Sequence, residues 1–114
     1  MKISNYDILE QQADLCSTMA HAKRLAILEV LKRGEASVGE LADALGSSIS
    51  AVSQHLRIMR DKEVVLTRRD GRTVYYRLSN LKIAVCCAMV REVLLEGLIA
   101  RGRRAEELDQ EREI

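Results

Sequence analysis

The sequence predicts a mainly α-helical fold that carries one two-stranded β-hairpin. Two observations support this fold class. Apolar residues recur at helical spacing through most of the 114 residues, whereas residues 64–78 alternate with a period of two around Asp70-Gly71. No repeat, low-complexity segment or linker interrupts the chain. We therefore expect a single domain over residues 1–114.

The first two helices are expected at about residues 5–17 and 19–31. His21 stands at the start of the second helix, where a capping or hydrogen-bonding role is the favoured interpretation. Three leucines of this helix recur at the spacing of one helical face, which supports the assignment. They are Leu25, Leu28 and Leu31.

A helix–turn–helix is expected over about residues 38–61. Ser37 and Glu40 have the S-x-x-E spacing of a capping box, which indicates the start of a two-turn helix that ends at Gly46. The pair Ser47-Ser48 can cap the second helix of the motif. Apolar spacing predicts that this second helix buries one face. Its expected inner residues are Ile49, Val52, Leu56 and Met59.

The hairpin is expected over about residues 64–78, and a long last helix follows over about residues 80–105. Two strand-like runs, residues 64–69 and 72–78, flank Asp70-Gly71. An Asp-Gly pair between such runs indicates a tight turn, because glycine accepts the positive φ that the turn requires. A helix–turn–helix followed by such a hairpin is the winged helix–turn–helix arrangement.

The outer face of the second motif helix suits double-stranded DNA. Short polar side chains allow the helix to enter the major groove and to donate or accept hydrogen bonds at base edges. Arginines in a hairpin beyond the helix can contact the phosphate backbone or the minor groove. Each feature alone also fits a solvated surface, but together they favour DNA binding. The candidate DNA-binding residues are Ser48, Ser50, Ala51, Ser53, Gln54, Arg57, Arg68, Arg69 and Arg72.

Composition and charge agree with a small regulator. The formal net charge is only +1, but residues 57–77 hold seven basic and three acidic side chains. The chain lacks Phe, Trp and Pro, so its core is limited, and we expect a homodimer that buries further apolar surface. No apolar run is long enough for a membrane span. We expect a cytoplasmic protein whose three cysteines are reduced.

Three blocks of the sequence resemble the ArsR/SmtB repressors of bacteria and archaea. The blocks are residues 19–31, 39–65 and 67–80, and the resemblance extends over about residues 15–98. It implies a winged-helix homodimer that the first and last helices form, and a repressor that an inducer releases from its operator. Within the recognition-helix pattern, Ser50, Ser53 and Gln54 match positions that commonly touch bases. Ile49 departs from that pattern, because a polar residue is usual there.

No metal site of the known family types is expected. The soft-metal site needs two cysteines in the first motif helix, but Ser37 and Gly39 stand at those positions. The zinc site on the last helix retains one ligand of four, Glu96, because the other three positions do not carry the usual ligands. These three positions are Asn80, Lys82 and Val93. His55 lies inside a helix and is interpreted as a structural or phosphate-facing residue.

Three interpretations of Cys16, Cys86 and Cys87 stay open. They are packing in a buried helix, a metalloid site of three thiolates, and a persulfide or oxidant switch. Packing is favoured, because residues 83–90 are apolar on every side. A resident cofactor is not expected, and a thiol-bound metalloid would act as an inducer.

Two other function classes compete with DNA binding. A thiol enzyme would require a base near Cys87, and the last helix contains no histidine, so we expect no enzyme. A winged helix can also serve as a protein-binding scaffold, because a fold does not by itself determine function. The arginines of the hairpin argue against a scaffold.

Overall fold

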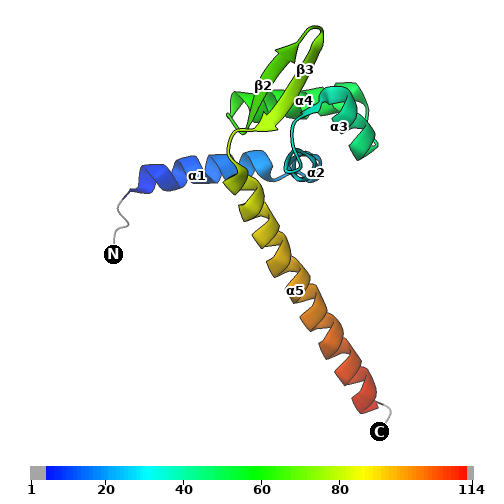
Figure 1. Ribbon diagram of the computed structural model, residues 1–114. Coiled ribbons are helices and arrows are strands. Elements are labelled where there is room, and N and C mark those ends of the chain that lie inside the picture. The colour runs from blue at the N-terminus through cyan, green and yellow to red at the C-terminus, as the bar shows by residue number, and fades with distance from the viewer. Residues whose placement is uncertain (1–4, 113–114) are drawn as a thin grey trace. The chain divides into compact units, whose positions relative to one another are not determined.

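A computed structural model describes residues 5–112 of the chain (Figure 1). The chain consists of two compact units, one ending at Leu81 and the other beginning at Lys82. The mainly α-helical class with a hairpin wing is confirmed. The elements are α1 Tyr6–Met19, α2 Ala22–Leu31, β1 Ala36–Ser37, α3 Val38–Leu45, α4 Ile49–Asp61, β2 Val65–Asp70, β3 Thr73–Leu78 and α5 Leu81–Arg112.

Three of the helices begin at side-chain caps. The Nδ1 atom of His21 accepts a hydrogen bond from the Lys23 amide at 3.2 Å, which confirms the capping role expected of His21. The capping box at α3 is also present, since Ser37 and Glu40 exchange reciprocal hydrogen bonds. At α4, the Ser48 hydroxyl accepts from the Ala51 amide at 3.1 Å. These contacts satisfy amides that would otherwise lack partners at the helix starts.

The sheet has three antiparallel strands in the order β1-β3-β2, one more than the sequence predicted. The extra strand β1 has only two residues, and Ser37 pairs with Tyr75 of β3. The hairpin strands pair from Val65 and Leu78 to Asp70 and Thr73. In Figure 1, the hairpin stands out from the helices around its base.

The hairpin turn lies one residue later than the sequence predicted. Asp70 belongs to β2, so Gly71 and Arg72 form the two-residue loop. Gly71 has φ 61°, and among residues 5–112 Arg72 is not one of those with positive φ. A positive φ at only the first loop residue is the pattern of a type II′ turn, in which glycine is preferred at that position.

The core of the first unit lies beneath the helix–turn–helix and the base of the hairpin. Most of the predicted inner face of α4 is confirmed, because Val52, Leu56 and Met59 are at most 1% exposed. The prediction for Ile49 is wrong, because this side chain is 57% exposed. Ile49 is the first residue of α4 and lies almost a full turn before Val52, at the end of the helix where its apolar stripe is no longer covered.

The second unit consists of α5, which extends to Arg112 and so beyond the predicted end. Many apolar side chains of α5 are exposed in the single chain. The most exposed are Met89, Val90, Val93, Leu94 and Ile99. None of the helices between residues 5 and 112 combines the length and the apolar character that a membrane crossing requires.

Candidate nucleic-acid interface

The outer face of α4 presents the side chains that the sequence predicted. Ser50, Ala51, Ser53, Gln54 and Arg57 are all exposed, and we call these five residues the reading face. Because one face of α4 is fully buried, the reading face is the side of the helix available to a partner. Its hydroxyl, amide and guanidinium groups can pair with base edges and phosphates.

Ser48 is also exposed, but it serves first as the N-cap of α4. Its oxygen accepts from the Ala51 amide, which leaves the hydroxyl hydrogen available to donate. Next to it, the Lys23 ammonium donates to the hydroxyl oxygen of Ser47 and so links α2 to the loop before α4. The start of α4 is therefore held by its own N-cap, Ser48, and by the contact of Lys23 of α2 with Ser47.

His55 connects α4 to α2 on the inner side of the helix. Its Nδ1 atom accepts a hydrogen bond from Arg24 Nε at 3.3 Å, and its ring centroid lies 4.5 Å from that of His21. The other side of the Arg24 guanidinium donates to the Thr18 carbonyl at 2.9 Å, near the end of α1. The structural role expected of His55 agrees with these contacts.

The contacts of His55 predict a loss of stability in mild acid. Burial, and then electrostatic interactions with His21, Arg24 and Lys23, lower the pKa of His55 below its ordinary value of 6.5. The unfolded chain therefore binds more protons below about pH 6.5 than the folded chain does, and the free energy of unfolding falls with falling pH. We expect His55→Gln to reduce this fall. Urea denaturation at several values between about pH 7.5 and 5.5 measures it.

Glutamine keeps an acceptor for Arg24, so His55→Gln preserves the hydrogen bond while it removes the titrating group. A second variant, Asp43→Asn, changes an exposed carboxylate of α3 and should retain the pH dependence of the native protein. An unaltered pH dependence in His55→Gln would show that another group causes it.

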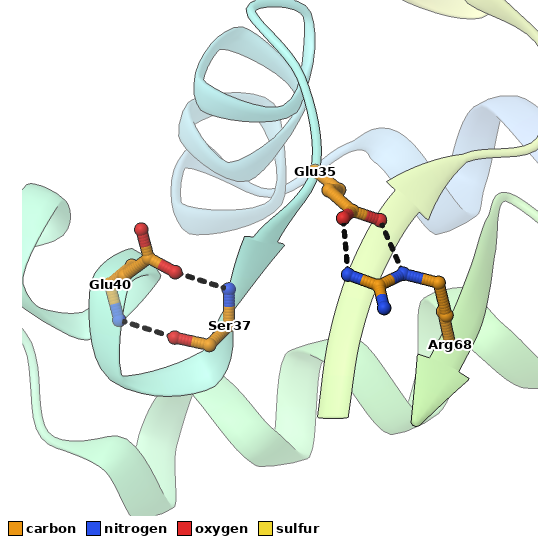
Figure 2. A network of polar contacts seen from close by, with 4 residues as sticks. All are labelled: Glu35, Ser37, Glu40 and Arg68. Atoms are coloured by element: carbon orange, nitrogen blue, oxygen red, sulfur yellow. Dashed lines mark hydrogen bonds and ion pairs between the residues drawn. The ribbon is translucent and has the colours of Figure 1, made fainter. Parts of the chain in front are cut away.

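The hairpin residues 65–78 form the wing, and its arginines occupy different surroundings. Arg68 donates two hydrogen bonds to the Glu35 carboxylate, from Nε at 3.2 Å and from the terminal nitrogen Nη2 at 2.5 Å. Its guanidinium also lies 4.7 Å from the centre of the Tyr75 ring. Arg69 alternates to the opposite face of β2, the face of the buried Val65, and Arg72 lies in the turn. Figure 2 shows Arg68 directed toward Glu35.

The base of the wing is tied to the end of α4. The Val64 amide donates to the Met59 carbonyl at 2.8 Å, so the chain leaves the helix in a fixed direction. The Ser79 hydroxyl lies 2.6 Å from the carbonyl oxygen of Glu63, to which it donates a hydrogen bond. Glu63 has φ 60°, a left-handed conformation that this hydrogen bond helps to hold. These hydrogen bonds therefore fix the base of the wing against the end of α4.

None of the three cysteines forms a disulfide. Cys16 and Cys86 are exposed, and Cys87 is half-buried. Cys16 belongs to the first unit, whereas Cys86 and Cys87 belong to the second. Within either unit, over the described residues 5–112, no three His, Cys, Asp or Glu side chains gather in a way that could hold a metal ion.

Two residues near the interface were not predicted from the sequence. Ile49 was assigned to the core, although its place directly after the cap Ser48 indicates a position at the open end of the helix. The contact of Glu35 could not be predicted, because its partner Arg68 is 33 positions away in the sequence. No local pattern in the sequence indicates that pair.

Comparison with known proteins agrees with this geometry. A family model described as "Bacterial regulatory protein, arsR family" matches residues 21–66. Nodulation protein NolR of Rhizobium meliloti is 48% identical over 71 residues, which cover 62% of this chain and 58% of NolR. Transcriptional activator HlyU of Vibrio cholerae is 45% identical over 83 residues, 73% of this chain and 77% of HlyU. A transcriptional repressor SmtB homolog of Synechocystis is 40% identical over 79 residues, 69% of this chain and 60% of that protein.

A solved structure supports the same assignment. The homodimeric winged helix-turn-helix DNA-binding domain of Mb0332 from Mycobacterium bovis has 31% sequence identity and a TM-score of 0.73. The match covers 86% of this chain and 91% of that domain. With its reading face, its wing and relatives that it matches over most of their length, the chain belongs to the arsR family of bacterial regulatory proteins, which are winged-helix DNA-binding transcriptional regulators.

Proposed function

We propose that the reading face of α4 enters the major groove of an operator while the wing contacts the flanking backbone. The observation that carries this proposal is the division of α4 into a buried face and an exposed polar face. The side chains of Ser50, Ser53 and Gln54 are short enough to let the helix come close to the base edges and contact them. Arg57 lies one helical turn beyond Gln54. Arg69 and Arg72 supply sequence-independent contacts with phosphates.

Fluorescence anisotropy on duplex DNA from upstream of the protein's own gene tests the proposal. The native protein should prefer this DNA to a scrambled duplex of the same length. Gln54→Ala should lose about 1–3 kcal/mol of this discrimination, because a side chain that pairs with two atoms of one base is removed. Equal affinity of the native protein for both duplexes would contradict base reading by α4.

We further propose that two copies bind together, each placing one α4 in a half-site. The solved relative Mb0332 is described as homodimeric, and exposed apolar side chains on α1 and α5 can be covered by a second copy. Half-sites would then lie about 34 Å apart, one turn of DNA. Sedimentation of the protein with a duplex of two half-sites tests the ratio, which should be two chains to one duplex.

Repression is the proposed direction of control, in the bacterial cytoplasm where the operator lies. One relative is named as a repressor, and another is named as an activator. A promoter fusion distinguishes the two directions, because loss of this protein should raise transcription from its own promoter. A fall in transcription would instead indicate an activator.

Ile49 is proposed to contact the methyl group of a thymine. It is the first residue of α4, and the N-terminal part of a recognition helix is the part that meets base edges. An exposed isoleucine at this point is apolar, as is the thymine methyl in the major groove. We expect replacement of one operator thymine by deoxyuridine to weaken native binding about four-fold, since one buried methyl is lost.

The variant Ile49→Ala supplies the control for this prediction. At the contacted position, the variant should bind the thymine and deoxyuridine duplexes equally, because it no longer covers the methyl group. Each thymine of a half-site is replaced in turn, and binding is followed by anisotropy. The same response of native protein and variant at every thymine would contradict the contact.

Release from DNA by a small inducer is also proposed, with the thiols as one candidate sensor. Exposure of Cys16 and Cys86 supports reaction with a metalloid or a persulfide, whereas half-buried Cys87 also fits packing. The reduced protein on its DNA should be titrated with arsenite, zinc and a persulfide donor. A triple variant of Cys16, Cys86 and Cys87 to serine is the control. Release of both proteins alike would leave the thiols without a sensing role.

A further inference from the structure

The contact between Glu35 and Arg68 joins two parts of the first unit that are far apart in sequence. Glu35 immediately precedes β1, in the segment between α2 and α3, and Arg68 lies in the middle of β2. Strand β3 separates β1 from β2 in the sheet. The ion pair therefore spans the full width of the sheet, as Figure 2 shows.

The register places the partners of this contact on one face of the sheet. Tyr75 pairs with Arg68 on one side and with Ser37 on the other, so these three side chains share a face. The Arg68 guanidinium crosses the Tyr75 ring at 4.7 Å and ends at the Glu35 carboxylate. A planar guanidinium that is held at its fork by a carboxylate and on its face by a ring has a fixed direction.

The same contact makes Arg68 less suitable as a phosphate ligand. Two of its N–H groups are already donated to Glu35, and the carboxylate next to it would repel a phosphate. In agreement, the hydrogen bond from Arg68 lowers the pKa of Glu35. By contrast, Arg69 and Arg72 form no ion pair with a carboxylate among the residues that the structure describes. Arg68 therefore differs in role from its two neighbours.

We infer that Glu35 and Arg68 form a lock that sets the angle of the wing, and that Arg68 is a positioning residue rather than a DNA contact. The lock fixes β2 to the start of the helix–turn–helix, because Ser37 is both the end of β1 and the N-cap of α3. The wing is thereby held relative to the motif that contains the reading face. This inference rests on the proposed contact of the wing with the DNA backbone.

A charge exchange tests the lock. Arg68→Glu alone should weaken DNA binding, because two carboxylates then face each other across the sheet. The double variant Glu35→Arg/Arg68→Glu restores an ion pair with unchanged net charge, and it should recover native affinity to within about two-fold. If Arg68 were a phosphate ligand, the double variant would remain as weak as Arg68→Glu.

The salt dependence of binding provides a second readout. Arg68→Lys keeps the charge but loses the two-pronged contact, so it should weaken binding up to about five-fold with an unchanged salt slope. Glu35→Gln should also weaken binding, relative to Asp43→Asn, which removes an exposed negative charge from α3. Tighter binding with a slope steeper by about 0.9 in Glu35→Gln would instead identify Arg68 as a phosphate ligand and overturn the lock.

Failure of the lock is distinguishable from failure of the proposed wing contact. Arg69→Ala and Arg72→Ala report on the wing contact, because the ion pair of Glu35 is made by Arg68 and not by either of these residues. If these two variants bind DNA like the native protein, the wing is not at the backbone, and the proposed function fails in that part. Thermal melting of each variant, followed by circular dichroism, shows whether it is folded. A double variant that recovers native DNA affinity is folded, because an unfolded chain would not bind the operator.

Discussion

Replacement of Leu56 by alanine is expected to lower the free energy of unfolding by about 2–5 kcal/mol. Leu56 is fully buried on the inner face of α4. A folded domain of this kind is stabilised by only about 5–15 kcal/mol, so this change removes a large part of it. Guanidinium denaturation at one fixed protein concentration measures the loss, because the proposed dimer would make stability depend on protein concentration.

The matched control for this experiment is Ile58→Ala on the same helix. Ile58 is 40% exposed, so its truncation removes fewer packing contacts and leaves no enclosed cavity. We expect a clearly smaller loss than for Leu56. Equal losses would show that the inner face of α4 is not the packed core that the burial pattern indicates.

Removal of the two outer wing arginines should weaken binding to every DNA sequence. In the double variant Arg69→Ala/Arg72→Ala, two phosphate contacts are lost, so the slope of log affinity against log salt should become shallower by about 1.8. The ratio between operator and scrambled duplex should stay nearly constant, because backbone contacts carry no base information. Anisotropy titrations at several salt concentrations measure both quantities.

The variant Arg103→Ala is the control for charge alone. It removes one positive charge from the exposed end of α5, in the second unit. Its salt slope should match that of the native protein. A double wing variant that changes base preference and retains the native salt slope would contradict the roles assigned to Arg69 and Arg72.

The helix starts could be predicted from the sequence with good accuracy. His21, Ser37 and Ser48 cap the helices they were expected to cap, because each contact reaches only two or three residues along the chain. The hairpin was predicted as well, but its turn lies at Gly71-Arg72 rather than at Asp70-Gly71. Strand pairing decides such a shift of one residue, and the turn sequence alone does not.

Features that depend on distant residues could not be predicted. Strand β1 has two residues, and it exists because Ser37 and its neighbour pair with β3. Ile49 has the periodicity of a core residue, yet it lies where no neighbouring element covers it. Periodicity reports which side of a helix a residue occupies, but it does not report how far along the helix the covering surface extends.

The sequence by itself determined the order of the helices and the hairpin and the candidate reading face, because helix caps, apolar spacing and turn residues act over a few neighbouring positions. The family was indicated by the resemblance of three sequence blocks, residues 19–31, 39–65 and 67–80. Only the tertiary structure showed that Arg68 forms an ion pair with Glu35 and that His55 accepts a hydrogen bond from Arg24. These partners are 33 and 31 positions apart, and the folded backbone sets the distance between them. The distinction between Arg68 as a positioning residue and Arg69 and Arg72 as residues proposed to bind DNA therefore required the sheet register.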